Sequence, residues 1–190
     1  MEFKGSQTEK NLLSAFAGES QARNRYTFFA SVAKKEGYEQ ISAIFQETSD
    51  NEKEHAQIFF ECLKGGMAEI TAAYPAGIIG GTADNLKTAA DGEKFEWTML
   101  YPNFGEVAEK EGFKEIAVTF RQVAKVEAYH ERRYMKLLDS VKMGKVFKKD
   151  SPIKWKCRNC GFVHESNEAP AACPVCDHSR SYFEVWVENY

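Results

Sequence analysis

Two glutamate–histidine pairs stand on helical stretches whose inward faces are otherwise apolar. Glu52 precedes His55 by three residues, and Glu127 precedes His130 by the same spacing. On a helix, residues three apart lie on one face, one turn from each other. A buried ionised carboxylate must be neutralised, paired or bound to a metal, because burying it alone is costly. We interpret both pairs as metal ligands, the ordinary alternative being two solvated ion pairs on the surface.

Three further glutamates extend this set. Glu19 and Glu93 lie on the inward stripes of two other predicted helices. One Glu from each of two helices, together with Glu-x-x-His from each of the other two, is the ligand set of a dinuclear carboxylate site. Carboxylates and imidazoles together suit iron or manganese. Glu96, one turn after Glu93, is a candidate fifth carboxylate that should favour the oxidised metals through its extra negative charge; its alternative is a surface acid.

Two tyrosines follow the carboxylates along the same helices. Tyr26 comes seven residues after Glu19, and Tyr101 comes eight residues after Glu93. Each phenol can hydrogen-bond a ligand carboxylate or a bound oxygen species. The alternative is that both rings only pack in the core.

Four of the five cysteines form two CxxC pairs near the C-terminus. Twelve residues separate the pairs, which lie in "CRNC" and "CPVC". Four thiolates with this spacing can close a tetrahedron around one metal ion, and the spacing does not choose between zinc and iron. So short a segment cannot bury a self-sufficient core, so the metal must supply much of its folding free energy. The four candidate ligands are Cys157, Cys160, Cys173 and Cys176.

The positions of these residues require four helices. Hydrophobic periodicity predicts helices at about 8–37, 38–64, 85–111 and 113–143. The first and third links are short, whereas the second is a long Gly- and Pro-containing segment. One long crossover among four helices is the layout of a ferritin-like bundle. We therefore predict a mainly α protein with a bundle domain at 1–147 and a small metal-bound β domain at 148–190.

The bundle also contains an internal repeat. A shift of 75 residues aligns "KKEGYEQISAIFQ" with "EKEGFKEIAVTFR" and carries the first Glu-x-x-His pair onto the second. The same shift carries Glu19 onto Lys94, one residue past Glu93. The third helix should therefore hold one extra residue, absorbed as a π-bulge or with the help of Pro102.

Composition excludes several other classes of function. The net charge of −3 and the lack of a basic cluster argue against a nucleic-acid partner. The sequence shows no signal-peptide pattern and no long apolar run, so we expect a cytoplasmic protein without a membrane partner. The stretch "GIIGGT" lacks the context of a nicotinamide-binding motif, so we expect no nicotinamide cofactor to bind this chain directly.

These motifs, in this order, resemble the rubrerythrins over the whole chain. The resemblance implies a non-haem diiron peroxidase that reduces hydrogen peroxide to water in defence against oxidative stress. It also implies a rubredoxin-type Fe(Cys)4 centre that passes electrons to the diiron pair, with zinc as a substitute in some preparations. Because the chain has no nicotinamide site of its own, a separate reductase or a rubredoxin-type donor would deliver the electrons. The expected assembly is a homodimer in which the four-cysteine domain of one subunit serves the diiron site of the other.

The resemblance assigns individual roles as well. Glu52 and Glu127 would bridge two irons in an oxo- and carboxylate-bridged site, Glu19 and Glu93 would be terminal ligands, and His130 would hold one iron. The other iron would exchange His55 for Glu96 on oxidation. The expected catalytic groups are Glu96, His55, Tyr26 and Tyr101.

One departure from the family pattern concerns the four-cysteine domain. Asp177 stands where simple rubredoxins have glycine, which raises the question of how the nearby backbone amide is placed. Two other functions remain open from the residues: a ferroxidase or iron-storage protein, and an inert bundle that carries a structural zinc module.

Overall fold

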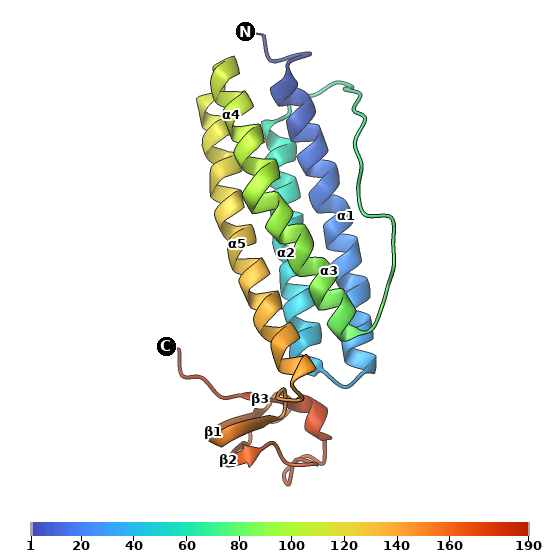
Figure 1. The fold of residues 1–190 in the computed structure, drawn as a ribbon, viewed down its shortest axis with the longest axis vertical. Helices are drawn as coiled ribbons and strands as arrows, with labels where there is room; N and C mark the ends of the chain where they lie inside the picture. Colours follow the sequence, from blue (N-terminus) through green and yellow to red (C-terminus); the bar gives the residue numbers. More distant parts are fainter. Residues whose placement is uncertain (1, 190) are drawn as a thin grey trace.

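The helices expected from the periodicity form a long bundle in the computed structural model, which describes residues 2–189 (Figure 1). A π-helical turn, Glu96–Leu100, joins α3 to α4 without a break, so the third helix of the bundle is one continuous rod. The helices are α1 (Gln7–Lys35), α2 (Glu39–Cys62), α3 (Thr82–Phe95), α4 (Tyr101–Glu111) and α5 (Lys114–Lys142). The strands are β1 (Lys148–Cys157), β2 (Val163–Glu168) and β3 (Phe183–Val185).

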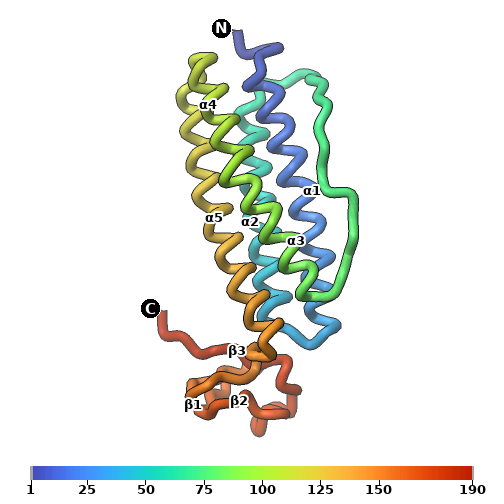
Figure 2. The backbone as a smooth tube through the Cα atoms, viewed as in Figure 1, coloured from blue at the N-terminus to red at the C-terminus, as the bar shows by residue number. Residues whose placement is uncertain are grey.

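The four rods pack as two antiparallel pairs. The trace in Figure 2 runs down α1 and up α2, returns along the outside of the bundle, and then runs up α3–α4 and down α5. The main helix contacts are α1 with α2 and α5 with α3 and α4. The prediction of a ferritin-like bundle with one long crossover is therefore confirmed.

The crossover segment is attached to α1 and α3 by side chains. The Tyr74 hydroxyl donates a hydrogen bond of 2.8 Å to the Ser14 carbonyl. Its ring packs over Gly18, where an added Cβ would lie 3.6 Å from the nearest ring carbon. At the far end, the Asn85 amide closes a pair of hydrogen bonds with the Gly80 backbone. These contacts hold the segment against the bundle.

Glycines end the first helix of each half of the repeat. Gly37 and Gly112 have φ values of +83° and +92°, in the left-handed region that terminates helices. Both belong to the same Lys-Glu-Gly signature in the repeated sequence. The short links predicted between α1 and α2, and between α4 and α5, lie at these positions.

The extra residue predicted in the third helix forms the π-helical turn. The backbone N–H of Tyr101 donates to the carbonyl of Glu96, five residues earlier. Pro102 follows in the first turn of α4. The prediction of a π-bulge, made from the one-residue mismatch between the repeats, is confirmed, and in the structure the bulge begins at Glu96.

The bundle core divides into two apolar clusters with a polar layer between them. One cluster surrounds Tyr26, Phe45 and Tyr134, and the other surrounds Phe59 and Phe120. The glutamates and histidines predicted as ligands come from the helix turns between these clusters, so the polar groups are enclosed at mid-bundle. The buried layer comprises Glu19, Glu52, His55, Glu93, Glu127 and His130.

The small domain is a three-stranded antiparallel sheet of order β2-β1-β3. Trp155 in the central strand pairs with His164 and Val185 and is fully buried. Where the domain meets the bundle, Tyr38 stacks on Phe147 with ring centroids 6.0 Å apart. None of the helices in residues 2–189 is both long enough and apolar enough to cross a bilayer.

Candidate metal centres

Two overlapping groups of four side chains meet at mid-bundle. In each group, one potential ligand atom per residue lies within 4.8 Å of all the others. Glu52 and Glu127 belong to both groups, as bridging carboxylates would. The geometry therefore provides two adjacent cation positions with two shared glutamates. The first group is Glu19, Glu52, His55 and Glu127, and the second is Glu52, Glu93, Glu127 and His130.

Both histidines turn Nδ1 toward the shared carboxylates. His55 Nδ1 lies 2.9 Å from Glu52 Oε2 and 2.9 Å from Glu127 Oε1. His130 Nδ1 lies 2.8 Å from Glu127 Oε2 and 3.2 Å from Glu52 Oε1. The two imidazole rings stack with centroids 6.0 Å apart. The repeat thus gives the two metal positions nearly equivalent surroundings.

These close approaches are mostly not hydrogen bonds. Among the described residues, both Glu127 oxygens, Glu52 Oε1 and His130 Nδ1 are buried without a partner in hydrogen-bond geometry. Buried polar atoms are normally paired, and so many orphans in one place need an explanation. Lone pairs that converge without hydrogen-bond geometry fit metal cations, and this donor set suits iron.

The protonation behaviour of this layer points the same way. Burial lowers the pKa of each histidine, but the carboxylates outweigh it and raise the pKa of His55 to about 10 and that of His130 to about 12. Burial first, and then neighbouring carboxylates, raise the pKa of Glu19 and Glu93. Without cations the layer must hold extra protons, so metal binding should release protons and weaken in acid.

Each tyrosine donates its hydroxyl to a carboxylate of another helix. Tyr26 of α1 donates to Glu93 Oε1 of α3 at 2.5 Å. Tyr101 of α4 donates to Glu19 Oε1 of α1. Both rings are also fully buried. Core packing and hydrogen bonding to a ligand carboxylate are therefore not exclusive here: each ring packs in the core, and each phenol donates to a predicted ligand.

Glu96 differs from the other predicted ligands. It is half-buried, and its carboxylate belongs to neither four-residue group within residues 2–189. It stands one helical turn after Glu93. Burial raises the pKa of Glu96 strongly, and the charges of Glu93 and Glu127 raise it further. The structure thus gathers six of the seven predicted diiron ligands and places Glu96 at their edge.

Two contacts beside the site were not expected from the sequence. The Trp97 indole donates to Glu131 Oε2 at 2.6 Å. The guanidinium of Arg25 lies near Gly92, where an added Cβ would be 4.0 Å from Nη2, and its Nε and Nη1 are buried without a partner in the described chain. The only available sequence signal was position, because Trp97 and Glu131 each directly follow a predicted ligand.

The four cysteines also converge as predicted. Their Sγ atoms all lie within 4.8 Å of one another. Two pairs approach more closely, Cys157 with Cys176 at 3.7 Å and Cys160 with Cys173 at 3.6 Å. Cys157 and Cys173 are buried, whereas Cys160 is exposed at the domain surface. The thiolates form a compact four-sulfur site with one open edge.

Asp177 does not disturb the second cysteine knuckle. Its φ is +59°, which a glycine would adopt more easily. Its N–H donates to the Cys173 carbonyl at 2.9 Å, just as the Gly161 N–H donates to the Cys157 carbonyl at 2.9 Å. The Asp177 amide is therefore placed as in the glycine-containing knuckle. The replacement of glycine by Asp177 does not displace this backbone amide.

The fold and the two clusters define a class of protein: a ferritin-like diiron protein with a rubredoxin-like four-cysteine domain. The family model Rubrerythrin matches residues 10–138, and the model of the rubrerythrin rubredoxin-like domain matches residues 155–184. A rubrerythrin of Porphyromonas gingivalis is 65% identical over 98% of this chain and 94% of its own length. The chain belongs to the rubrerythrin family.

Two further relatives agree. A rubrerythrin of Clostridium perfringens is 54% identical over 98% of both chains. A solved structure of nigerythrin in its fully reduced, all-ferrous state has a TM-score of 0.64 at 29% identity, covering 97% of this chain and 89% of that chain. The chain accordingly has a diiron carboxylate–histidine site, a rubredoxin-like four-cysteine site and an iron-based oxidoreductase function.

Proposed function

We propose that this protein is a peroxidase that reduces hydrogen peroxide to water. The balanced reaction consumes one peroxide, two protons and two electrons and yields two water molecules. The observation that carries the proposal is the presence of both sites in one chain. A one-electron four-cysteine centre that recharges a two-iron site serves repeated reduction of a substrate, whereas an iron-storage protein needs no such supply of electrons.

The side chains would support this reaction in distinct ways. Bound iron would supply electrons to the peroxide and polarise its O–O bond. Tyr26 and Tyr101 hold Glu93 and Glu19 in fixed orientations through their hydroxyl groups. Burial of the layer excludes bulk water, which strengthens every electrostatic interaction inside it.

We further propose that His55 and Glu96 exchange as ligands when the site changes oxidation state. His55 lies within a four-residue group, and Glu96 lies at the edge of the cluster. Since an added carboxylate favours the more highly charged metals, Glu96 should replace His55 on oxidation. Both remain proposed catalytic groups, together with the two tyrosines.

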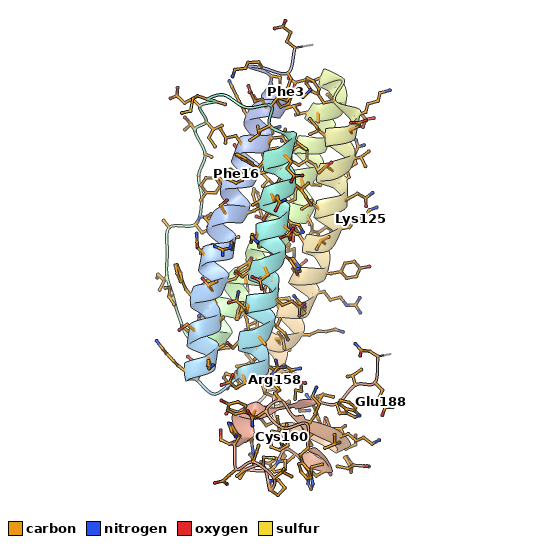
Figure 3. The ribbon with its side chains drawn as sticks, turned by 180° about the vertical axis from the view of Figure 1, so that it is seen from behind. Phe3, Phe16, Lys125, Arg158, Cys160 and Glu188 are labelled. Carbon is orange, nitrogen blue, oxygen red and sulfur yellow. The ribbon has the colours of Figure 1, made fainter. Side chains whose placement is uncertain are left out.

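Electron transfer is proposed to occur between subunits of a homodimer. His130 lies twelve residues before the end of α5, which corresponds to about 18 Å of helix. Beyond that end, the small domain that contains Cys160 extends away from the bundle (Figure 3). Because electron tunnelling weakens steeply with distance, a second copy that brings its four-cysteine site closer would give a faster path.

Stopped-flow mixing of peroxide with the anaerobically reduced protein tests the activity. We expect fast, stoichiometric reoxidation of both iron centres by peroxide and much slower reoxidation by oxygen. A preference for oxygen, accompanied by mineral formation, would instead indicate ferroxidase activity and iron storage.

The relay is tested by Cys160→Ser. This variant should keep single-turnover oxidation of the diiron site by peroxide, because the bundle is unchanged. It should lose turnover with an external reductant, because the iron of the four-cysteine site is absent or altered. Cys62→Ser is the matched control. Cys62 lies in the bundle and belongs to none of the metal-ligand groups, so this variant should retain turnover. Normal turnover of Cys160→Ser would refute the relay.

A further inference from the structure

The π-helical turn Glu96–Leu100 sets the rotation of everything that follows it in the third helix. One residue corresponds to about 100° of rotation in a regular helix. If the turn relaxed to regular α-helix, α3 and α4 would rotate relative to each other by about that angle. Glu93 before the turn and Tyr101 after it could then no longer face the same layer. Such turns are rare and therefore need support from their surroundings.

One side chain of the turn reaches α5. The indole N–H of Trp97 donates to Glu131 Oε2 at 2.6 Å, and both side chains are half-buried. A hydrogen bond to a carboxylate is charge-assisted and stronger than a neutral one. Trp97 directly follows Glu96, and Glu131 directly follows His130. The bond therefore links the π-helical turn to α5, and on each of these two elements the bonded residue directly follows a proposed ligand.

We infer that Trp97 and Glu131 are positioning residues for Glu96, and that they act through the hydrogen bond between them. It holds the π-helical turn against α5, so that the Glu96 side chain moves to and from the metals while its backbone stays in place. The inference rests on the proposed exchange of Glu96 with His55. It fits the position of Glu96 beside the cluster but outside both four-residue groups.

Neighbouring side chains on the turn make good controls. Phe95, directly before the turn, and Met99, within it, are 55% and 63% exposed, so they contribute little to the packing against α5. Met99→Ala alters the same turn without touching the hydrogen bond. Trp97→Phe keeps an aromatic ring but removes the N–H donor. Glu131→Gln keeps an acceptor oxygen, whereas Glu131→Ala removes it.

The primary measurement is the reduction potential of the iron-loaded diiron site, determined without peroxide. Trp97→Phe and Glu131→Ala should raise it, because Glu96 would stabilise the oxidised state less well. Peroxide reoxidation should slow by about 10-fold, as is typical when the partner of a metal ligand is lost. Glu131→Gln should keep the reduction potential and the reoxidation rate close to those of the wild type, and Met99→Ala should match the wild type.

A second series shows whether the pair acts through Glu96. In a Glu96→Ala background, adding Trp97→Phe should cause no further shift in the potential, because the positioned carboxylate is gone. An equal shift in both backgrounds would overturn the inference, and so would identical behaviour of Glu131→Gln and Glu131→Ala. Since the potential is measured without substrate, it tests the pair even if the wild type proves inactive toward peroxide.

Discussion

At the residue scale, the site depends on side chains that hold other side chains. Tyr26 and Tyr134 lie in one aromatic cluster, with ring centroids 5.6 Å apart. Both are fully buried, but the Tyr26 hydroxyl donates to Glu93. The Tyr134 hydroxyl makes no hydrogen bond to a predicted ligand carboxylate among the described residues, and the side chain it approaches is that of Thr48. Comparing Tyr26 with Tyr134 therefore distinguishes the contribution of a buried ring to packing from the contribution of a hydroxyl group that bonds a metal ligand.

This difference predicts unequal effects of removing one oxygen atom. Tyr26→Phe should lower iron affinity by about 10-fold, because Glu93 loses the donor that orients it. Tyr101→Phe should behave similarly through Glu19. Tyr134→Phe, the matched control, should bind iron as the wild type does. Competition with a chelator of known affinity measures all three, and equal losses in all variants would contradict the orienting role.

At the element scale, the start of α1 is fastened to the end of α4. The Ser6 hydroxyl accepts the N–H of Glu9 at 3.1 Å. The Glu111 carboxylate accepts the N–H groups of Gln7 at 3.1 Å and Thr8 at 2.8 Å. The first three N–H groups of the helix, which lack partners within it, are thus satisfied. A residue from the second half of the repeat caps the first helix of the bundle.

Glu111→Gln should destabilise the folded protein by about 1 kcal/mol near neutral pH, since it removes a charged cap. Partial burial raises the pKa of Glu111, but hydrogen bonds from Thr8 and Gln7 outweigh it and hold the pKa below 4.5. The stabilisation is therefore present above about pH 4.5 and is lost as the pH falls through the lower folded value.

Chemical denaturation of both proteins at a series of pH values measures this difference. The gap between wild type and Glu111→Gln should be largest above pH 4.5 and should shrink in acid. Comparing the two proteins cancels the loss of metal that acid causes in both. A gap that does not change with pH would show that the charge of Glu111 does not matter.

At the scale of the whole molecule, the two iron sites lie in different domains, and the small domain continues beyond the end of the bundle (Figure 1). The exposed edge of the four-cysteine site at Cys160 suits electron exchange with another protein surface. In the proposed symmetric dimer each subunit would present the same surfaces, so each four-cysteine site could serve the other subunit's bundle.

Mixed dimers test this arrangement directly. If the proposed relay and dimer are correct, Cys160→Ser should impair the relay and Glu127→Gln should impair the diiron site, so each homodimer should lose turnover. Co-expressed dimers with one chain of each kind should regain about half of the wild-type turnover, because one of the two pairings between subunits is intact. Mixed dimers as inactive as their parents would point to electron transfer within a single chain.

Much of this protein was determined by its sequence alone. The repeat of Glu-x-x-His at 75 residues, the helical periodicity and the two CxxC pairs predicted the bundle, both clusters and the family. Even the π-helical turn followed from the mismatch between Glu19 and Glu93. These predictions succeeded because metal ligands need specific residue types at spacings set by helix geometry, which is local along the chain.

Only the tertiary structure decided which residues meet across helices. The pairing of Tyr26 with Glu93, of Tyr101 with Glu19 and of Trp97 with Glu131 depends on how separate helices are rotated against each other. The position of Glu96 beside the ligand groups has the same origin. Such contacts join residues far apart in sequence, and no local spacing encodes them, because packing of whole helices sets their relative rotation.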